Sequence, residues 1–274
     1  MSKKLLKDLK ETVKFLQKQY KKVPQAGIVL GSGLGNFASQ IKVEKEVPYE
    51  DIPHFPVSTV EGHSGKLIFG KLGEKTVVAM GGRFHYYEGY TPQEVVFPIR
   101  VMKMLGIQTL FLSNAAGAVN PSFKVGDIMI IKDHISFFTP NPLIGKNHTE
   151  LGPRFPDMSE PYKKTLIQQA KDIAAKNDID IKEGVYVAVT GPTFETRAEY
   201  KLIQVVGGDV VGMSTVQETI VAGHMGLPVF AVSIVTDLGI RDDENIITHE
   251  EVLQAAKEAE PKLALLFKEL VASI

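Results

Sequence analysis

Short apolar runs that alternate with helical patterns restrict the fold of this 274-residue chain more than any other feature. Several of the runs are apolar on both faces, as strands buried inside a sheet tend to be. The runs occupy residues 26–30, 67–70, 76–80, 109–113, 127–132, 185–189, 209–212 and 228–235. Because strands and helices alternate, we expect one α/β domain spanning residues 1–274. Ligands of such folds usually bind at loops just beyond the strand ends.

Capping boxes mark several predicted helix starts, because a threonine and a glutamate three residues later satisfy free backbone N–H groups. The pairs are Thr91–Glu94, Thr196–Glu199, Thr215–Glu218 and Thr248–Glu251. Another helical pattern follows Ser159 and ends near Asn177, and Pro261 should kink or end the last helix early. The first segment is predicted to be a surface helix, because apolar residues recur at helical spacing at Leu5, Leu6, Leu9, Val13, Leu16 and Tyr20.

Charge and cysteine content exclude several classes of function. The formal net charge of −1 gives no basic field for DNA or RNA. The absence of cysteine excludes a disulfide framework, a cysteine nucleophile and thiolate metal sites, and it suits a reducing cytosol. The N-terminus lacks the apolar core of a signal peptide, and no apolar stretch approaches the ~20 residues that span a membrane. We therefore expect a cytoplasmic protein with neither nucleic acid nor membrane as a partner.

The loop GSGLGN at residues 31–36 follows the first apolar run. A dinucleotide fingerprint needs glycine where this chain has Asn36, and no Gly-Lys-Ser/Thr follows to make a P-loop. A small anion could bind backbone N–H groups here, with the Ser32 hydroxyl as a further donor. A plain strand-to-helix turn that needs glycine explains the loop equally well.

Two further loops carry cationic or titratable side chains. EGHSGK at 61–66 contains His63, and GGRFHYYEGY at 81–90 contains Arg83 and His85 at alternate positions. In an extended segment these two side chains point the same way. Arginine is the preferred bidentate partner of phosphate, so Arg and His together in glycine-flanked loops favour an anion site. Small residues in SNAAGAVN, at 113–120, would let a ligand approach the backbone.

The loop TGPTFETRAEY, at 190–200, offers two carboxylates with different explanations. Capping explains Glu199. Glu195 lies before the helix, where capping does not explain it, so a functional role is favoured. Beside Phe194, its carboxylate could accept hydrogen bonds from a heterocycle stacked on the ring.

Later strand ends contribute the remaining candidates. VVGMSTVQE places Met213 and Ser214 at a strand-to-helix junction, although methionine is usually core filler. Asp237 follows a strand in SIVTDLGI. His249 follows the predicted N-cap, where the positive helix end disfavours imidazolium and favours a neutral histidine.

Together these motifs resemble the trimeric type of purine nucleoside phosphorylase, the family that prefers 6-oxopurine nucleosides. The resemblance runs in order through GSGLG, EGHSG, GRFHYYEGY, NAAG, GPTFETRAE, GMSTVQE and HEEVL. It implies a mixed, partly closed β-sheet flanked by helices, and a homotrimer. It also implies that the opening loop takes free phosphate.

The resemblance also implies a role for each matching residue. The phosphate-binding set is Ser32, His63, Arg83, His85, Ala115 and Ser214. The ribose contacts are Tyr87, Met213 and His249, and the base contacts are Phe194, Glu195 and Asp237. The catalytic groups are His85, Glu195 and Asp237. Phosphate is a co-substrate in this reaction, and neither a metal nor another cofactor is expected.

Two positions depart from the family pattern. Leu151 stands where a neighbouring subunit would lend an aromatic residue to the ribose pocket. Asp237 replaces the asparagine of 6-oxopurine members and matches the related methylthioadenosine phosphorylases, whereas Glu195 belongs to the 6-oxopurine motif. We favour 6-oxopurine substrates, with Asp237 as a buried acid of raised pKa that protonates or hydrogen-bonds purine N7.

The predicted reaction converts a purine nucleoside and phosphate into free base and ribose 1-phosphate. Three alternatives stay open: a nucleoside hydrolase, a methylthioadenosine phosphorylase, and a nucleoside-binding protein without activity. Asn36 argues against a nicotinamide enzyme.

Overall fold

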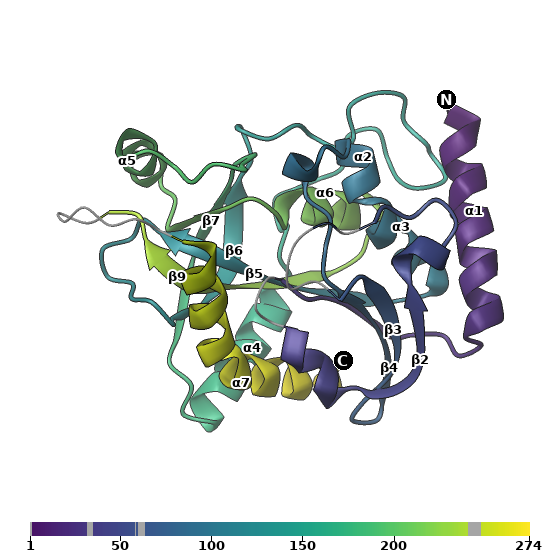
Figure 1. Ribbon diagram of the computed structural model, residues 1–274, viewed down its shortest axis with the longest axis horizontal. Helices are drawn as coiled ribbons and strands as arrows, with labels where there is room; N and C mark the ends of the chain where they lie inside the picture. The colour runs from purple at the N-terminus through teal and green to yellow at the C-terminus, as the bar shows by residue number, and fades with distance from the viewer. Residues whose placement is uncertain (1, 32–34, 58, 60–63, 241–247) are drawn as a thin grey trace.

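A computed structural model describes residues 2–31, 35–57, 59, 64–240 and 248–274. Within these residues, nine strands form one mixed sheet in the order β2-β3-β4-β1-β5-β8-β7-β6-β9 (Figure 1). The strands are β1 (Ala26–Val29), β2 (Lys42–Pro48), β3 (Lys66–Leu72), β4 (Lys75–Gly81), β5 (Thr109–Ala118), β6 (Ile128–Ile135), β7 (Ile181–Ala188), β8 (Val210–Gly212) and β9 (Val229–Leu238). All the predicted runs lie on strands, and the mixed α/β fold is confirmed.

The sheet closes on itself at one end because β5 pairs with both β8 and β9. Its pairing with β9 is parallel over most of its length, and near its C-terminal end Gly117 also pairs with Val211 of β8. The ring β5-β8-β7-β6-β9 is therefore a barrel, and β4, β1 and the hairpin of β2 and β3 extend it as an open sheet. The partly closed sheet is the predicted one.

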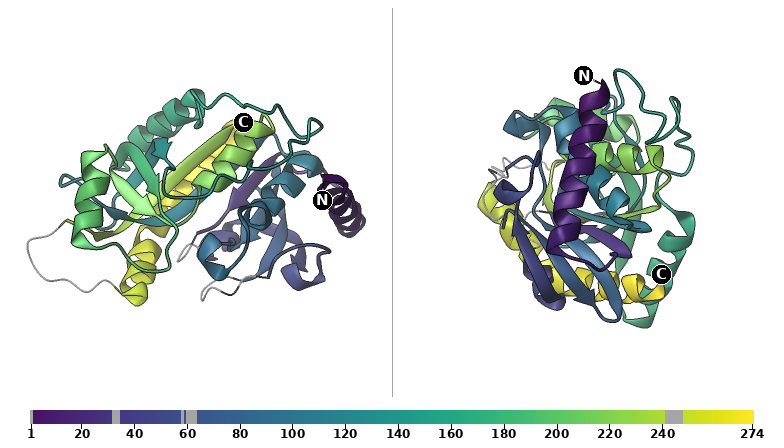
Figure 2. Two further views of the ribbon diagram at one scale, coloured as in Figure 1. Left: turned by 90° about the horizontal axis from the view of Figure 1, so that it is seen from above. Right: turned by 90° about the vertical axis from the view of Figure 1, so that its right-hand side faces the viewer.

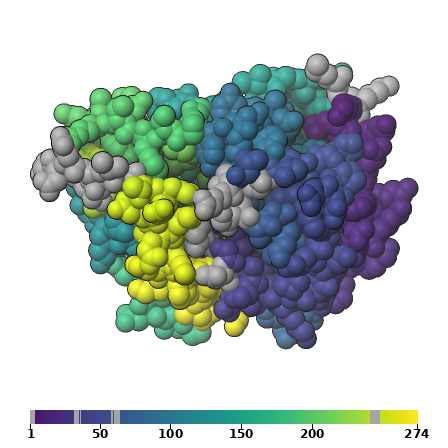
Figure 3. Space-filling view, viewed as in Figure 1, coloured from purple at the N-terminus to yellow at the C-terminus, as the bar shows by residue number. Residues whose placement is uncertain are grey.

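Helices surround the sheet (Figures 1 and 2). They are α1 (Ser2–Gln19), α2 (Pro92–Val95), α3 (Phe97–Leu105), α4 (Lys164–Lys176), α5 (Arg197–Val205), α6 (Val216–His224) and α7 (His249–Ser273), with short 3-10 turns η1 (Gly35–Gln40), η2 (Tyr49–Asp51) and η3 (Tyr86–Glu88). The purple α1 runs along one edge, and the yellow α7 lies on the face shown in Figure 3. Within the described ranges, we find no helix that has both the length and the apolar character to cross a bilayer.

Three of the four predicted capping boxes are present, and one is not. Thr91, Thr196 and Thr248 each cap a helix with the expected glutamate. Thr215 has a φ of 70° and makes no capping bond, so that prediction was wrong. The helix expected after Ser159 begins only at Lys164.

The late start of α4 has a local cause. The Ser159 hydroxyl donates to Asp157 Oδ2 at 2.6 Å instead of capping a helix. Pro161 also disfavours the helical conformation at the residue before it. The helix ends at Lys176, close to the predicted end at Asn177.

Helix α7 continues through Pro261 to Ser273, so the early end did not occur. Its axis bends along its length in both Figures 1 and 2. Beyond the proline, Leu263, Leu266 and Phe267 are buried against the core. This packing offsets the cost of a proline inside a helix, which is about 3 kcal/mol.

Strand β2 was not among the strands predicted from apolar runs. Its sequence, KVEKEVP, is rich in charge, and most of its residues are exposed. It is an edge strand that pairs only with β3 in the described structure. Charged side chains are common on edge strands because they block pairing with other chains, so a search for apolar runs misses such a strand.

Candidate active site

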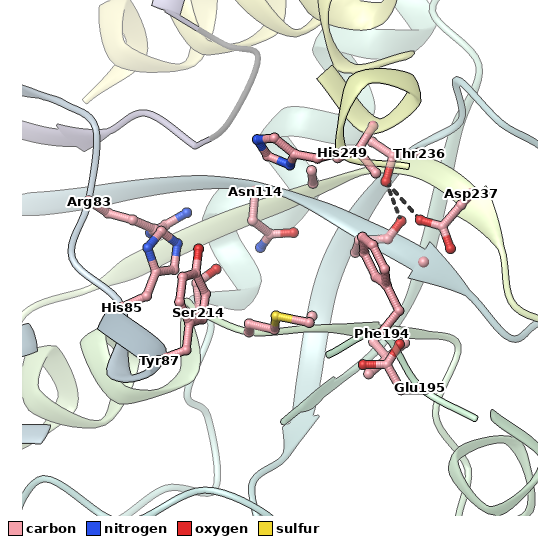
Figure 4. A pocket seen from close by; sticks show the side chains of 17 residues that line it. Arg83, His85, Tyr87, Asn114, Phe194, Glu195, Ser214, Thr236, Asp237 and His249 are labelled. Carbon is pink, nitrogen blue, oxygen red and sulfur yellow. Dashed lines mark hydrogen bonds between the residues drawn. The ribbon is translucent and has the colours of Figure 1, made fainter. Parts of the chain in front are cut away.

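A cavity of about 110 Å³ opens where β5, β8 and β9 end and α7 begins (Figure 4). Ten predicted site residues line it, although they come from distant parts of the chain: Arg83, His85, Tyr87, Ala115, Phe194, Glu195, Met213, Ser214, Asp237 and His249. The structure thus gathers every predicted site residue that it describes.

Ser32 and His63, the other two predicted residues, lie outside the described residues. Gly31, just before Ser32, packs closely against β5. A Cβ at this position would lie 2.7 Å from the backbone oxygen of Ser113, so the first glycine of the loop is required for packing.

Arg83, two residues beyond β4, is held by a buried ion pair. Its Nε and Nη2 donate to the two carboxylate oxygens of Glu218 on α6, at 3.2 and 2.7 Å. The two side chains are 1% and 3% exposed. Nη1 also donates to the backbone oxygen of Ser113. Glu218 is unavailable for capping for this reason, and the guanidinium is fixed at one end of the cavity.

His85 stands beside Arg83 with a defined protonation state. Its Nδ1 lies 3.0 Å from Glu88 Oε1, and its ring stacks on Tyr87 with centroids 4.6 Å apart. Burial lowers the pKa of His85 although Glu88 opposes the shift. Burial would raise the pKa of Glu88, but hydrogen bonds from His85 and Thr59 outweigh it and bring that pKa to about 2. The pair therefore consists of a neutral imidazole and an ionised carboxylate at neutral pH.

Ser214 and its neighbours form the wall at the start of α6. The Asn114 amide donates to Thr215 Oγ1 at 2.8 Å, and that hydroxyl lies 3.1 Å from Ser214 Oγ. The positive φ of Thr215 is unusual for a residue with a side chain and is typical of functional sites. The wall therefore presents a hydroxyl at the positive end of a helix, where anions bind.

The opposite end of the cavity carries carboxylates and an aromatic ring (Figure 4). Burial raises the pKa of Glu195, and the charges of Asp237 and Glu199 add to the rise. Asp237 is 7% exposed and accepts a hydrogen bond from Thr236 Oγ1 at 3.1 Å. A Cβ on Gly117 would lie 2.6 Å from Asp237 Oδ2, so glycine makes room for this carboxylate. In Figure 4 the Phe194 ring lies on the side of Asp237 that faces the cationic end.

His249 is the first residue of α7 and lines the cavity between its two ends (Figure 4). The cap at Thr248 fixes the start of this helix, because Thr248 Oγ1 accepts from the Glu251 backbone N–H at 3.3 Å. The sequence placed His249 correctly because the capping box is a local signal.

Several polar groups of the site were not predicted as such: Glu88, Asn114, Thr236 and Glu218. All four lie within motifs quoted above, and Glu218 was assigned to a capping box. Glu218 pairs with a residue 135 positions away, a distance over which local spacing gives no signal.

A group with metal-ligand geometry lies elsewhere. Among the residues the structure describes, only Asp8, Glu11 and His54 bring three such atoms within 4.8 Å of one another, and none of them lines the cavity.

Comparison with known proteins identifies the family. The sequence profile of the phosphorylase superfamily matches residues 25–272. Purine nucleoside phosphorylase 1 of Geobacillus stearothermophilus is 50% identical over 263 residues, which cover 96% of each chain. Purine nucleoside phosphorylase of Bos taurus is 45% identical and covers 97% of this chain and 95% of its own. This chain belongs to the purine nucleoside phosphorylases. It is therefore an enzyme.

Solved purine nucleoside phosphorylases share the whole fold. Isoform 2 of the Schistosoma mansoni enzyme, in complex with cytosine and ribose-1-phosphate, has a TM-score of 0.93 and is 43% identical. The match covers 98% of this chain and 96% of that one. A second Schistosoma mansoni structure, in complex with adenosine, also has a TM-score of 0.93 at 42% identity. None of these relatives is a methylthioadenosine phosphorylase, so they give that alternative no support.

Proposed function

We propose that this enzyme catalyses the reversible phosphorolysis of purine ribonucleosides and 2′-deoxyribonucleosides, inosine and guanosine among them. The products are the free base and ribose or deoxyribose 1-phosphate. One observation carries the proposal: a single cavity has a cationic end at Arg83 and a carboxylate end at Glu195 and Asp237. A phosphate and a purine can occupy these ends with the sugar between them.

Phosphate binds at the cationic end in this proposal. Arg83 supplies charge, the Ser214 hydroxyl donates, and small Ala115 lets the anion approach β5. His85 is neutral before phosphate arrives, and the anion then favours its protonation. Ser32 and His63 complete the set, as the family motifs predict.

The sugar lies across the middle of the cavity. Tyr87 and His249 offer polar groups for its hydroxyls, and Met213 packs against its apolar face. Burial raises the pKa of the Tyr87 hydroxyl to about 12, so this group stays protonated and can donate.

The chemistry is a substitution at C1′ of the sugar. As the bond from C1′ to the purine nitrogen breaks, its electron pair moves to the purine and C1′ becomes cationic. A phosphate oxygen then forms the new bond to C1′. Glu195 and Asp237 hydrogen-bond the base as it gains negative charge, and Phe194 stacks on it. Groups placed where charge develops stabilise the transition state. Phosphate is the nucleophile, so the proposed reaction requires no metal or organic cofactor.

We also propose that the enzyme is a homotrimer with a role in purine salvage in the cytoplasm. The loop after β6 supports an interface between subunits, because Phe137 is 92% exposed, Ile144 70% and Phe155 87%. Exposed apolar groups of this size commonly mark interaction surfaces. Leu151, at the position of the expected aromatic contact, is buried within its own subunit. Sedimentation equilibrium would test the trimer, and a monomer at all concentrations would reject it.

The substrate class is tested by comparing inosine, guanosine and adenosine as substrates of the purified enzyme. We expect hypoxanthine and guanine to be released faster than adenine. Faster release of adenine would mean that Asp237 outweighs Glu195 in selecting the base, and it would reject the 6-oxopurine assignment.

A further inference from the structure

A second cavity, of about 80 Å³, lies between α3, the end of α6 and the loop that follows β6. Four of its lining residues can carry positive charge: Arg100, Lys146, His148 and His224. Leu5 of α1 contributes an apolar wall. Figure 1 shows α3 between α1 at the edge of the molecule and α6 near its centre. The volume is several times the ~10–15 Å³ that one water requires.

Arg100 is the unusual member of this group. Its side chain comes from the middle of α3, and the residue is only 6% exposed. Within the described residues its one hydrogen bond is from Nη1 to His224 Nδ1, at 3.4 Å, and no carboxylate charge perturbs it. Burial lowers its pKa only to about 10, so it stays charged at neutral pH. A buried charge without a counterion is costly, and guanidinium has five N–H donors to satisfy.

The surrounding contacts orient the cavity wall. His224 Nε2 lies 3.2 Å from Asn147 Oδ1, and its Nδ1 faces Arg100 as an acceptor. Burial lowers the pKa of His224, and the charge of Arg100 lowers it further, so its ring is neutral. The Gln93 amide donates to the backbone oxygens of Pro142 and Ile144, at 3.3 Å each. These bonds hold the loop that carries Lys146 and His148 against α2 and α6.

We propose that this cavity binds a phosphate group, either inorganic phosphate or a phosphate monoester, at a site separate from the one that holds Arg83. The planar guanidinium of Arg100 matches two phosphate oxygens, and Lys146 supplies a second charge. The apolar wall strengthens both interactions because it excludes water. Water alone could fill the cavity, but it would leave the charge of Arg100 without a counterion.

Equilibrium dialysis with labelled inorganic phosphate tests the proposal by counting sites per subunit. We expect two in the native enzyme and one in Arg100→Gln. Lys103→Gln is the matched control, because it removes a charge from the same helix at a residue that does not line the cavity. Retained cleavage of inosine would show that Arg100→Gln is folded. One site in the native enzyme, or two in Arg100→Gln, would overturn the proposal.

A second variant tests the site even if Arg100→Gln does not fold. Lys146 is exposed, so Lys146→Gln should fold normally and weaken the second site about tenfold or more, as loss of a charge-assisted hydrogen bond does. Unchanged affinity at that site would contradict the assignment of Lys146. Dialysis with ribose 1-phosphate distinguishes the two candidate ligands of the second site. Binding of ribose 1-phosphate at both sites would assign a phosphate monoester to the second site, and binding at one site only would assign inorganic phosphate.

Discussion

The buried pair of Arg83 and Glu218 predicts a variant that loses stability yet gains affinity for phosphate. Both charged groups are almost fully buried, and two hydrogen bonds of 3.2 and 2.7 Å join them. In Glu218→Gln the guanidinium stays buried without its counterion. Removing one partner of such a pair costs about 3–5 kcal/mol. For a chain of this size, that corresponds to a fall in Tm of roughly 6–20 °C.

Phosphate should reverse this loss. If phosphate binds Arg83, it supplies the missing negative charge, so Glu218→Gln should bind phosphate more tightly than the native enzyme does. A ligand at 100 times its Kd stabilises the folded state by about 2.7 kcal/mol. The rise in Tm on adding a fixed phosphate concentration should therefore be larger in the variant. Thermal unfolding followed by circular dichroism, with and without phosphate, measures both effects.

Glu160→Gln is the matched control for this prediction. Glu160 pairs with Lys163 at 3.1 Å, but these side chains are 35% and 44% exposed. Exposed pairs contribute about 0–1 kcal/mol, so this variant should unfold near the native temperature at every phosphate concentration. The reasoning is refuted if both variants lose the same stability, or if phosphate raises the Tm of Glu218→Gln less than that of the native enzyme.

Three further predictions concern the other charged groups. Glu195→Ala should lower turnover of inosine about 10²–10³-fold, whereas Glu199→Ala should not, because Glu199 caps α5. Equal losses of turnover in the two folded variants would contradict the assignment of Glu195 to the base site. Asp237→Asn should lower the rate with adenosine relative to the rate with inosine, since a carboxylate accepts a hydrogen bond from an amino group. If the ratio of these two steady-state rates were the same in the variant and the native enzyme at every pH, a role of Asp237 in base selection would be excluded. The pKa of Glu88 falls from 4.5 to about 2 on folding, so its stabilising effect is complete above pH 4.5 and disappears as the pH falls toward 2. Glu88→Gln should therefore lose about 1–2 kcal/mol relative to native at pH 6, a difference that shrinks toward pH 3 in urea unfolding. A difference that does not depend on pH would show that the hydrogen bonds from His85 and Thr59 to the Glu88 carboxylate are not the cause.

Local signals explain what the sequence could predict. Thr91, Thr196 and Thr248 cap helices because the threonine and glutamate of a capping box are three residues apart and act without the rest of the fold. Candidate residues were found because loops after buried strands carry most of the chemistry in α/β folds. The structure places Arg83 and Asp237, which are far apart in the sequence, in one cavity.

Long-range contacts explain the failures. The spacing of Thr215 and Glu218 is that of a capping box, but a distant arginine takes the carboxylate. No pattern within a few residues can reveal this competition. Buried side chains beyond Pro261 likewise hold α7 together through tertiary packing. The register that closes β5 onto β9 also depends on contacts across more than a hundred residues.

The most direct test of the account is to incubate inosine with the purified enzyme, with and without phosphate, and to measure hypoxanthine and ribose 1-phosphate. The two-ended cavity predicts that both products form in equal amounts and that neither forms when phosphate is absent. Release of hypoxanthine with free ribose in the absence of phosphate would contradict the account, because water would then be the nucleophile and the cationic end of the cavity would have no part in the reaction.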